Sequence, residues 1–174
     1  MNLQSSDFEL FELPEQFVQD RATIDSRWKD LQRQAHPDKF VAQGGAAQRL
    51  AMQWSVRINE AYGRLKDPQK RAAYLCELHG APIQAENNTA MPGAFLMQQM
   101  QWREALEEAT DGAQLGALDA EVAQARRAAL EQCQQLLDQA HNYPAAAQQV
   151  RALMFIERFS RDVQARLDSI EDRP

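Results

Sequence analysis

Residues 34–40 read Gln34-Ala35-His36-Pro37-Asp38-Lys39-Phe40, and this stretch decides how the chain folds on either side of it. Pro37 has no backbone N–H and disfavours helical backbone at His36, so a helix that arrives from Asp20 must end here. A second helical pattern leaves the stretch after Gly45. We therefore expect a polar, partly charged tip between two helices, a position where functional residues often lie.

Apolar residues on both sides of the tip recur at helical spacing. In the first segment Asp20 suits the N-cap, with the Thr23 hydroxyl in the first turn. The apolar side of this segment carries Ile24, Trp28, Leu31 and Ala35, and the opposite side carries Arg21, Arg27, Lys29 and Arg33. The apolar face of the second segment carries Ala47, Leu50, Ala51, Trp54, Ile58, Ala61, Tyr62 and Leu65. Two such stripes joined by a short loop predict an antiparallel helical hairpin.

Residues 58–74 continue the pattern, and the Asp67-Pro68 pair starts a further short helix with Pro at a tolerated first-turn position. An isolated His-Pro-Asp would fit a loop that is merely closed by Pro and capped by Asp. Together with these flanks, however, the first 80 residues resemble the J-domain, whose signature is His36-Pro37-Asp38. The resemblance implies a module that activates DnaK-type ATPase chaperones. Ala35 departs from the aromatic residue that many J-domains place before the His.

Composition and charge exclude several classes of function. No run of 18 apolar residues exists, and residues 1–15 are acidic and lack an apolar core, which argues against a membrane span and a targeting signal. Cys76 and Cys133 lie far apart without a CxxC, so we expect buried, reduced thiols in a cytoplasmic protein and no metal site. Residues 1–80 hold 11 acids and 11 bases, and the rest hold 14 acids and 8 bases. An acidic second half argues against nucleic acid as its partner.

The second half begins beyond a segment that disfavours helix. This segment contains Gly80, Pro82, Asn87, Asn88, Thr89, Pro92 and Gly93. Three helical patterns follow, at about 94–109, about 117–141, and from after Asn142 to about 170. The expected organisation is all-α: a J-domain at 1–80, a linker at 81–93 and an antiparallel three-helix bundle at 94–174.

The first helix of this bundle has two apolar faces. At about 100° per residue, its core face carries Phe95, Trp102, Leu106 and Ala109. A second face points roughly 100–200° away and carries Leu96, Met97, Met100, Gln101, Glu104 and Glu108. Phe155 similarly lies about 80° from the centre of its own helix's stripe, which consists of Ala152, Ile156, Phe159, Val163, Leu167 and Ile170. Packing of the two domains could bury the second face, but Met-rich apolar surface with an acidic rim is typical of a partner-binding site.

Residues 94–100 with Arg103-Glu104 are similar to the start of the C-terminal domain of HscB, the J-type co-chaperone family of bacterial iron–sulfur cluster assembly. The N-terminal half agrees at residues 30–34, 39–40, 74–75 and 78–80. The resemblance implies a surface for an IscU-like scaffold protein, on which clusters are built, at Leu96, Met97, Met100, Gln101, Glu104, Glu108 and Phe155. It implies a surface for an HscA-like, DnaK-type chaperone at His36, Pro37 and Asp38, with Arg27, Lys29, Arg33 and Lys39 steering the encounter. Gln101 replaces a frequent acid, and Met100 replaces a Leu.

Three functions are compatible with parts of this pattern. The favoured one is an adaptor that delivers the scaffold to the chaperone and stimulates its ATPase. A general J-protein that passes on unfolded clients lacks a Gly/Phe-rich linker or a cysteine-rich zinc segment after residue 80. An enzyme using His36 and Asp38 as an acid–base pair lacks a nucleophile or oxyanion donors nearby in sequence. We therefore expect no catalytic residues, no cofactor and no metal, and a bacterial cytoplasmic protein.

Overall fold

The computed structural model describes residues 2–172; Met1, Arg173 and Pro174, the outer ends of the two predicted domains, lie outside the described residues. The predicted all-α class is confirmed, with no strand in residues 2–172. The elements are α1 (Asp7–Leu10), α2 (Arg21–Ala35), the 3-10 helix η1 (Pro37–Gln43), α3 (Gly45–Lys66), α4 (Pro68–Leu78), α5 (Gly93–Glu108), α6 (Gly112–Gln134), the π-helix η2 (Gln135–Gln139) and α7 (Tyr143–Glu171). No helix among these residues combines the length and the apolar character that crossing a bilayer requires.

The chain forms two compact units, which divide between Leu75 and Cys76, inside α4. The first unit contains α1, α2, η1 and α3, and the second contains α5, α6, η2 and α7. Each unit is described by itself below. The domain limits at residues 80 and 93 stay a prediction.

Helix α2, the first helix of the hairpin, begins and ends where the sequence predicts. His36 adopts an extended backbone (φ −61°, ψ 125°) before Pro37, and α2 stops at Ala35. At the other end of α2, the carboxylate of Asp20 binds no backbone N–H but accepts a hydrogen bond from the Thr23 hydroxyl at 2.7 Å. Pro37 therefore ends the helix as expected, while Asp20 occupies the N-cap position but its carboxylate satisfies no N–H of the helix.

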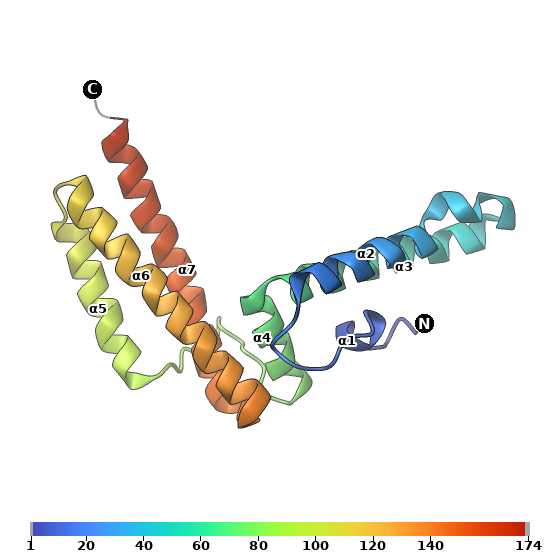
Figure 1. Ribbon diagram of the computed structural model, residues 1–174, viewed down its shortest axis with the longest axis horizontal. Helices are drawn as coiled ribbons and strands as arrows, with labels where there is room; N and C mark the ends of the chain where they lie inside the picture. Colours follow the sequence, from blue (N-terminus) through green and yellow to red (C-terminus); the bar gives the residue numbers. More distant parts are fainter. Residues whose placement is uncertain (1, 173–174) are drawn as a thin grey trace. The chain divides into compact units, whose positions relative to one another are not determined.

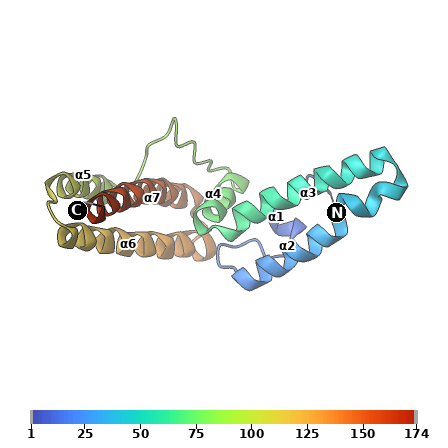
Figure 2. The same ribbon diagram turned by 90° about the horizontal axis from the view of Figure 1, so that it is seen from above.

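Helices α2 and α3 lie side by side and run in opposite directions (Figures 1 and 2). Their buried seam consists of Ile24, Leu31, Ala35, Ala51, Ile58, Ala61 and Leu65. Trp28 stacks on Tyr62 with ring centroids 4.6 Å apart, and its indole N–H donates to Asn59 at 3.0 Å. The expectation for Leu50 was wrong: it is 48% exposed, because it lies about 80° around α3 from Ile58 at the centre of the seam.

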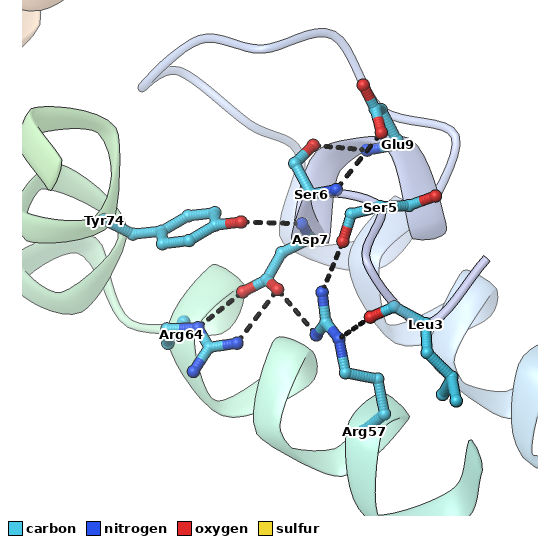
Figure 3. Close-up of polar contacts among 8 residues, drawn as sticks. All are labelled: Leu3, Ser5, Ser6, Asp7, Glu9, Arg57, Arg64 and Tyr74. Atoms are coloured by element: carbon cyan, nitrogen blue, oxygen red, sulfur yellow. Dashed lines mark hydrogen bonds and ion pairs between the residues drawn. The ribbon is translucent and has the colours of Figure 1, made fainter. Parts of the chain in front are cut away.

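A buried carboxylate fixes α1 to the hairpin (Figure 3). Asp7 is fully buried and accepts hydrogen bonds from Arg57 at 2.7 Å and from Arg64 at 2.6 and 3.0 Å. Its backbone N–H donates to the Tyr74 hydroxyl at 2.9 Å, and Arg57 also donates to the Ser5 carbonyl at 2.7 Å. Side chains from α3 and α4 thus meet at Asp7 of α1, α3 at its carboxylate and α4 at its backbone N–H. The sequence pattern did not reveal this cluster.

We expect Asp7→Asn to destabilise the first unit by about 2 kcal/mol, because two guanidinium groups lose their charged acceptor while the side chain keeps its size. For a unit of this length the melting temperature should fall by about 10 °C. Thermal unfolding followed by the fluorescence of Trp28 and Trp54 measures the effect. Glu9→Gln in the same short helix is the matched control, since Glu9 is exposed and bonds only at the Ser6 cap. Equal melting of the two variants would contradict this role of Asp7.

In the second unit, α5, α6 and α7 lie side by side with alternating direction (Figures 1 and 2). Helix α6 begins at Gly112, five residues before the expected start at Ala117, because the carboxylate of Asp111 caps it by accepting from the Gln114 N–H at 2.8 Å. Asn142 caps α7 in the same way, through the Ala145 N–H at 3.2 Å. The core of α7 includes Ala152, Ile156, Phe159 and Val163, whereas Leu167 and Ile170 of the predicted stripe are half-buried.

Arg151 of α7 holds the segment between α4 and α5. Its guanidinium is buried and donates to the carbonyls of Pro82 at 3.5 Å, Ile83 at 3.0 Å and Ala90 at 3.1 Å. Residues 81–92 contain no helix, as their composition predicts. Although irregular, this segment is fastened to α7 by the hydrogen bonds of this guanidinium.

Both cysteines are free and buried in the second unit. Burial raises the pKa of Cys76 to about 11 and that of Cys133 to about 12. The folded-state pKa values exceed those of the unfolded chain. The protonated thiols therefore make their full contribution to the free energy of unfolding below pH 9. This contribution is lost as pH rises through about 11 and 12.

We expect both thiols of the folded protein to resist an aromatic disulfide reagent at pH 8, where only about one Cys76 in a thousand is a thiolate and neither sulfur is accessible. After addition of denaturant, both thiols should react with the reagent at the same time. Leu78→Cys is the positive control, because this position is 40% exposed. Rapid labelling of the native parent protein, followed by absorbance, would show that the thiols are not protected as described.

Candidate functional site

The tip between α2 and α3 displays His36, Pro37 and Asp38. The side chains of His36 and Asp38 are 55% and 84% exposed, and no residue of η1 is buried. The His36 Nδ1 accepts a hydrogen bond from the Asp38 backbone N–H at 3.2 Å and lies 3.6 Å from the Asp38 carboxylate. Local bonds and the proline ring thus order the tripeptide, while its charged carboxylate points into solvent.

The bases near the tip do not share one face. Lys29, Arg33 and Lys39 are exposed, and Arg33 pairs with Asp30 at 2.7 Å. Arg27 differs from them, because its side chain is 43% exposed and pairs with Glu12 at 3.5 Å. Residues two positions apart in a helix lie about 160° apart around its axis. Arg27 therefore points to the N-terminal segment, and Lys29 points away from it. A role for these four bases in binding stays a prediction.

We expect Lys29→Glu with Arg33→Glu to slow association with a DnaK-type chaperone about tenfold at low salt, because charges at the rim of an interface act mainly on the encounter rate. Arg27→Glu should have a smaller effect, since that charge is already paired with Glu12. Stopped-flow association at several ionic strengths measures both. If the double variant associates like the parent protein at every salt concentration, these bases form only a solvated face.

The two predicted faces of α5 are confirmed. Trp102 and Ala109 are buried, and Phe95 and Leu106 are half-buried. On the other face Leu96 is 49%, Met97 63% and Met100 70% exposed. The polar residues beside them, Gln101, Glu104 and Glu108, are exposed as well. We call Leu96, Met97 and Met100 the α5 patch; its role in binding stays a prediction.

Phe155 is not part of this exposed surface, contrary to expectation. Its side chain is 7% exposed and packs edge-on against Phe95 at 5.7 Å and stacked against Phe159 at 5.9 Å between centroids. Helix α7 contacts both α6 and α5, so its buried sector is wider than the single stripe counted from sequence. The ring does line a groove between α5 and α7, and Arg103 lies over it at 5.4 Å.

Aromatic packing and one cap hold α5 in place. Trp102 lies edge-on to Phe95 at 5.9 Å and is stacked on Phe159 at 5.6 Å. Arg166 of α7 donates to the carbonyls of Leu106 at 3.4 Å and Ala109 at 3.2 Å, at the end of α5. No sequence signal shows this cap, because Arg166 lies 57 residues beyond Ala109 on another helix.

Nothing in residues 2–172 gathers three His, Cys, Asp or Glu side chains into a site that could hold a metal ion. The arrangement offers instead two exposed surfaces of different chemistry. One is a polar tip with a carboxylate and nearby bases, and the other is an apolar patch beside acids.

Comparison with known proteins shows which chains this one is similar to. Residues 91–164 match the family model described as the HSCB C-terminal oligomerisation domain. The co-chaperone protein HscB homologs of Burkholderia multivorans and Burkholderia thailandensis are 51% and 49% identical to the chain, over 98% of this chain and 99% of theirs. Chaperone HscB from Vibrio cholerae has 37% identity and a TM-score of 0.81, covering 95% of this chain and 99% of that one. Human HscB, at 23% identity, shares the fold with a TM-score of 0.87 over 95% of this chain and 84% of that one.

Proposed function

Because the chain belongs to the HscB family of co-chaperones, we propose that it binds an IscU-like iron–sulfur cluster scaffold protein and delivers it to an HscA-like, DnaK-type chaperone. The chain stimulates the ATPase of that chaperone and is not itself an enzyme. It works in the bacterial cytoplasm and binds neither nucleic acid nor membrane.

The tip acts on the chaperone. Asp38 and His36 engage it where its nucleotide domain meets the linker to its substrate domain, and Lys29, Arg33 and Lys39 orient the encounter. A faster hydrolysis step requires tighter binding to the hydrolysis-competent conformation than to the resting one. The 84% exposed carboxylate of Asp38 supports this role, because it is free to meet a cation of the chaperone.

The α5 patch holds the scaffold. Three apolar side chains that are about half or more exposed, beside Glu104 and Glu108, suit a partner with an apolar surface and basic neighbours. Holding scaffold and chaperone on one chain raises the effective concentration of each for the other.

The observation that carries the proposal is the exposure of Leu96, Met97 and Met100 on a helix whose other face is buried. The fastening of residues 81–92 by Arg151 differs from a mobile client-binding linker.

The proposal is tested by adding the purified chain to a DnaK-type chaperone of the HscA kind, with and without folded scaffold. ATP hydrolysis should rise with the chain alone and rise further with scaffold present. Denatured protein should not replace the scaffold. Equal stimulation by a denatured client would favour the general J-protein.

A further inference from the structure

The groove between α5 and α7 lies next to the α5 patch and carries a different charge pattern. It has a volume of about 340 Å³, with Phe155 and Phe159 at its base. Arg103 and Glu107 line it from α5, and Arg158 lines it from α7. Leu96 of the patch precedes Arg103 by seven residues and so lies only about 20° from it around α5. The groove therefore continues the patch on the side of α7.

The charged groups of this groove have no partners of their own. Arg103, Glu107, Arg158 and Asp162 are all exposed. Arg103 lies over the Phe155 ring, but Glu107, Arg158 and Asp162 form no ion pair or hydrogen bond within residues 2–172. Arginines that lie beside an apolar surface and lack a carboxylate partner suit an acidic side chain of another protein.

We propose that this groove is the second half of the scaffold-binding surface, and that Arg103 and Arg158 receive a carboxylate of the scaffold. This inference rests on the proposed function. It assigns the scaffold a stated chemistry: apolar side chains over the α5 patch, basic groups near Glu104 and Glu108, and an acidic side chain on the side of α7. Phe155 then contributes to scaffold binding indirectly, since its ring lines the groove and supports Arg103.

Arg158→Glu tests the proposal, because this side chain has no intramolecular partner whose loss could disturb the fold. Scaffold affinity of the full chain, measured by calorimetry with a purified bacterial scaffold protein, should fall about tenfold and lose part of its salt dependence. Arg158→Lys keeps the charge and should retain most of the affinity. Asp162→Asn, in the same groove, should bind as well as the parent protein or better. The melting temperatures of all three variants should match that of the parent.

The results separate this proposal from the one on which it rests. If the parent binds scaffold and substitution of the α5 patch prevents binding, but Arg158→Glu binds like the parent, the groove is not part of the interface. A parent chain that binds no scaffold would overturn both proposals. If Arg158→Glu instead changes only the self-association of the chain in sedimentation velocity, the groove receives a second copy, and the scaffold assignment is wrong.

Discussion

Replacing Leu96, Met97 and Met100 together by alanine should lower scaffold affinity several hundredfold, because a few apolar anchors usually dominate an interface. The melting temperature should change by no more than about 3 °C, since these side chains are 49%, 63% and 70% exposed and support no core. Stimulation of the chaperone by the chain alone should persist, while the additional stimulation by scaffold disappears. Calorimetric affinity and thermal unfolding of the same variant provide the two measurements.

Phe155→Ala is the comparison variant. It should lower the melting temperature, which the substitutions in the α5 patch should leave nearly unchanged. Removal of a buried ring that packs on Phe95 and Phe159 should cost about 3–5 kcal/mol of stability. Any loss of affinity would then accompany a lower melting temperature. If instead the α5 patch variant melts early and Phe155→Ala does not, the assignments of core and surface in this bundle are interchanged.

Asp38→Asn should reduce stimulation of the chaperone's ATPase by about 30-fold or more, because loss of one partner of an interfacial charge pair costs at least about 2 kcal/mol. The variant should fold normally, since Asp38 is 84% exposed and its backbone N–H, which bonds to His36, is retained. Scaffold binding should be unchanged. Steady-state ATP hydrolysis at subsaturating co-chaperone measures the effect.

Asp30→Asn is the control for Asp38→Asn, since it removes an exposed carboxylate from the same hairpin. It should reduce stimulation little, because that carboxylate pairs with Arg33 and lies away from the tip. Equal activity of Asp38→Asn and the parent protein would remove the tripeptide from its central role.

The hairpin and the two faces of α5 could be predicted because local physics decides them. Pro37 ends a helix whatever surrounds it, and side chains seven residues apart share a face in any helix. The exposure of Met97 and Met100 followed from position on the helix alone. Asp111 shows the limit of this approach, since the pattern starts this helix at about residue 117, whereas the Asp111 carboxylate caps it and α6 begins at Gly112.

The sequence pattern was insufficient where a second element decides the surroundings of a side chain. Arg27 lies on a polar stretch of α2, but the N-terminal segment returns beside it and supplies Glu12. Phe155 lies off the main stripe of α7, yet α5 covers that side as well. The spacing of residues within one helix contains no information on which neighbour will cover each side.

The Asp7 cluster was missed for a related reason, and it has a consequence for the newly made chain. Asp7 leaves the ribosome before the residues that bind its carboxylate, and Arg64 follows 57 residues later, which takes roughly 3–11 s at 5–20 residues per second. Until then the carboxylate that closes the first unit stays in water, and α1, four residues long, has no neighbour to hold it. Helix α1 is therefore synthesised before the α2–α3 hairpin but is fixed only once α3 is complete. During translation it stays accessible to proteases and holding chaperones for that interval.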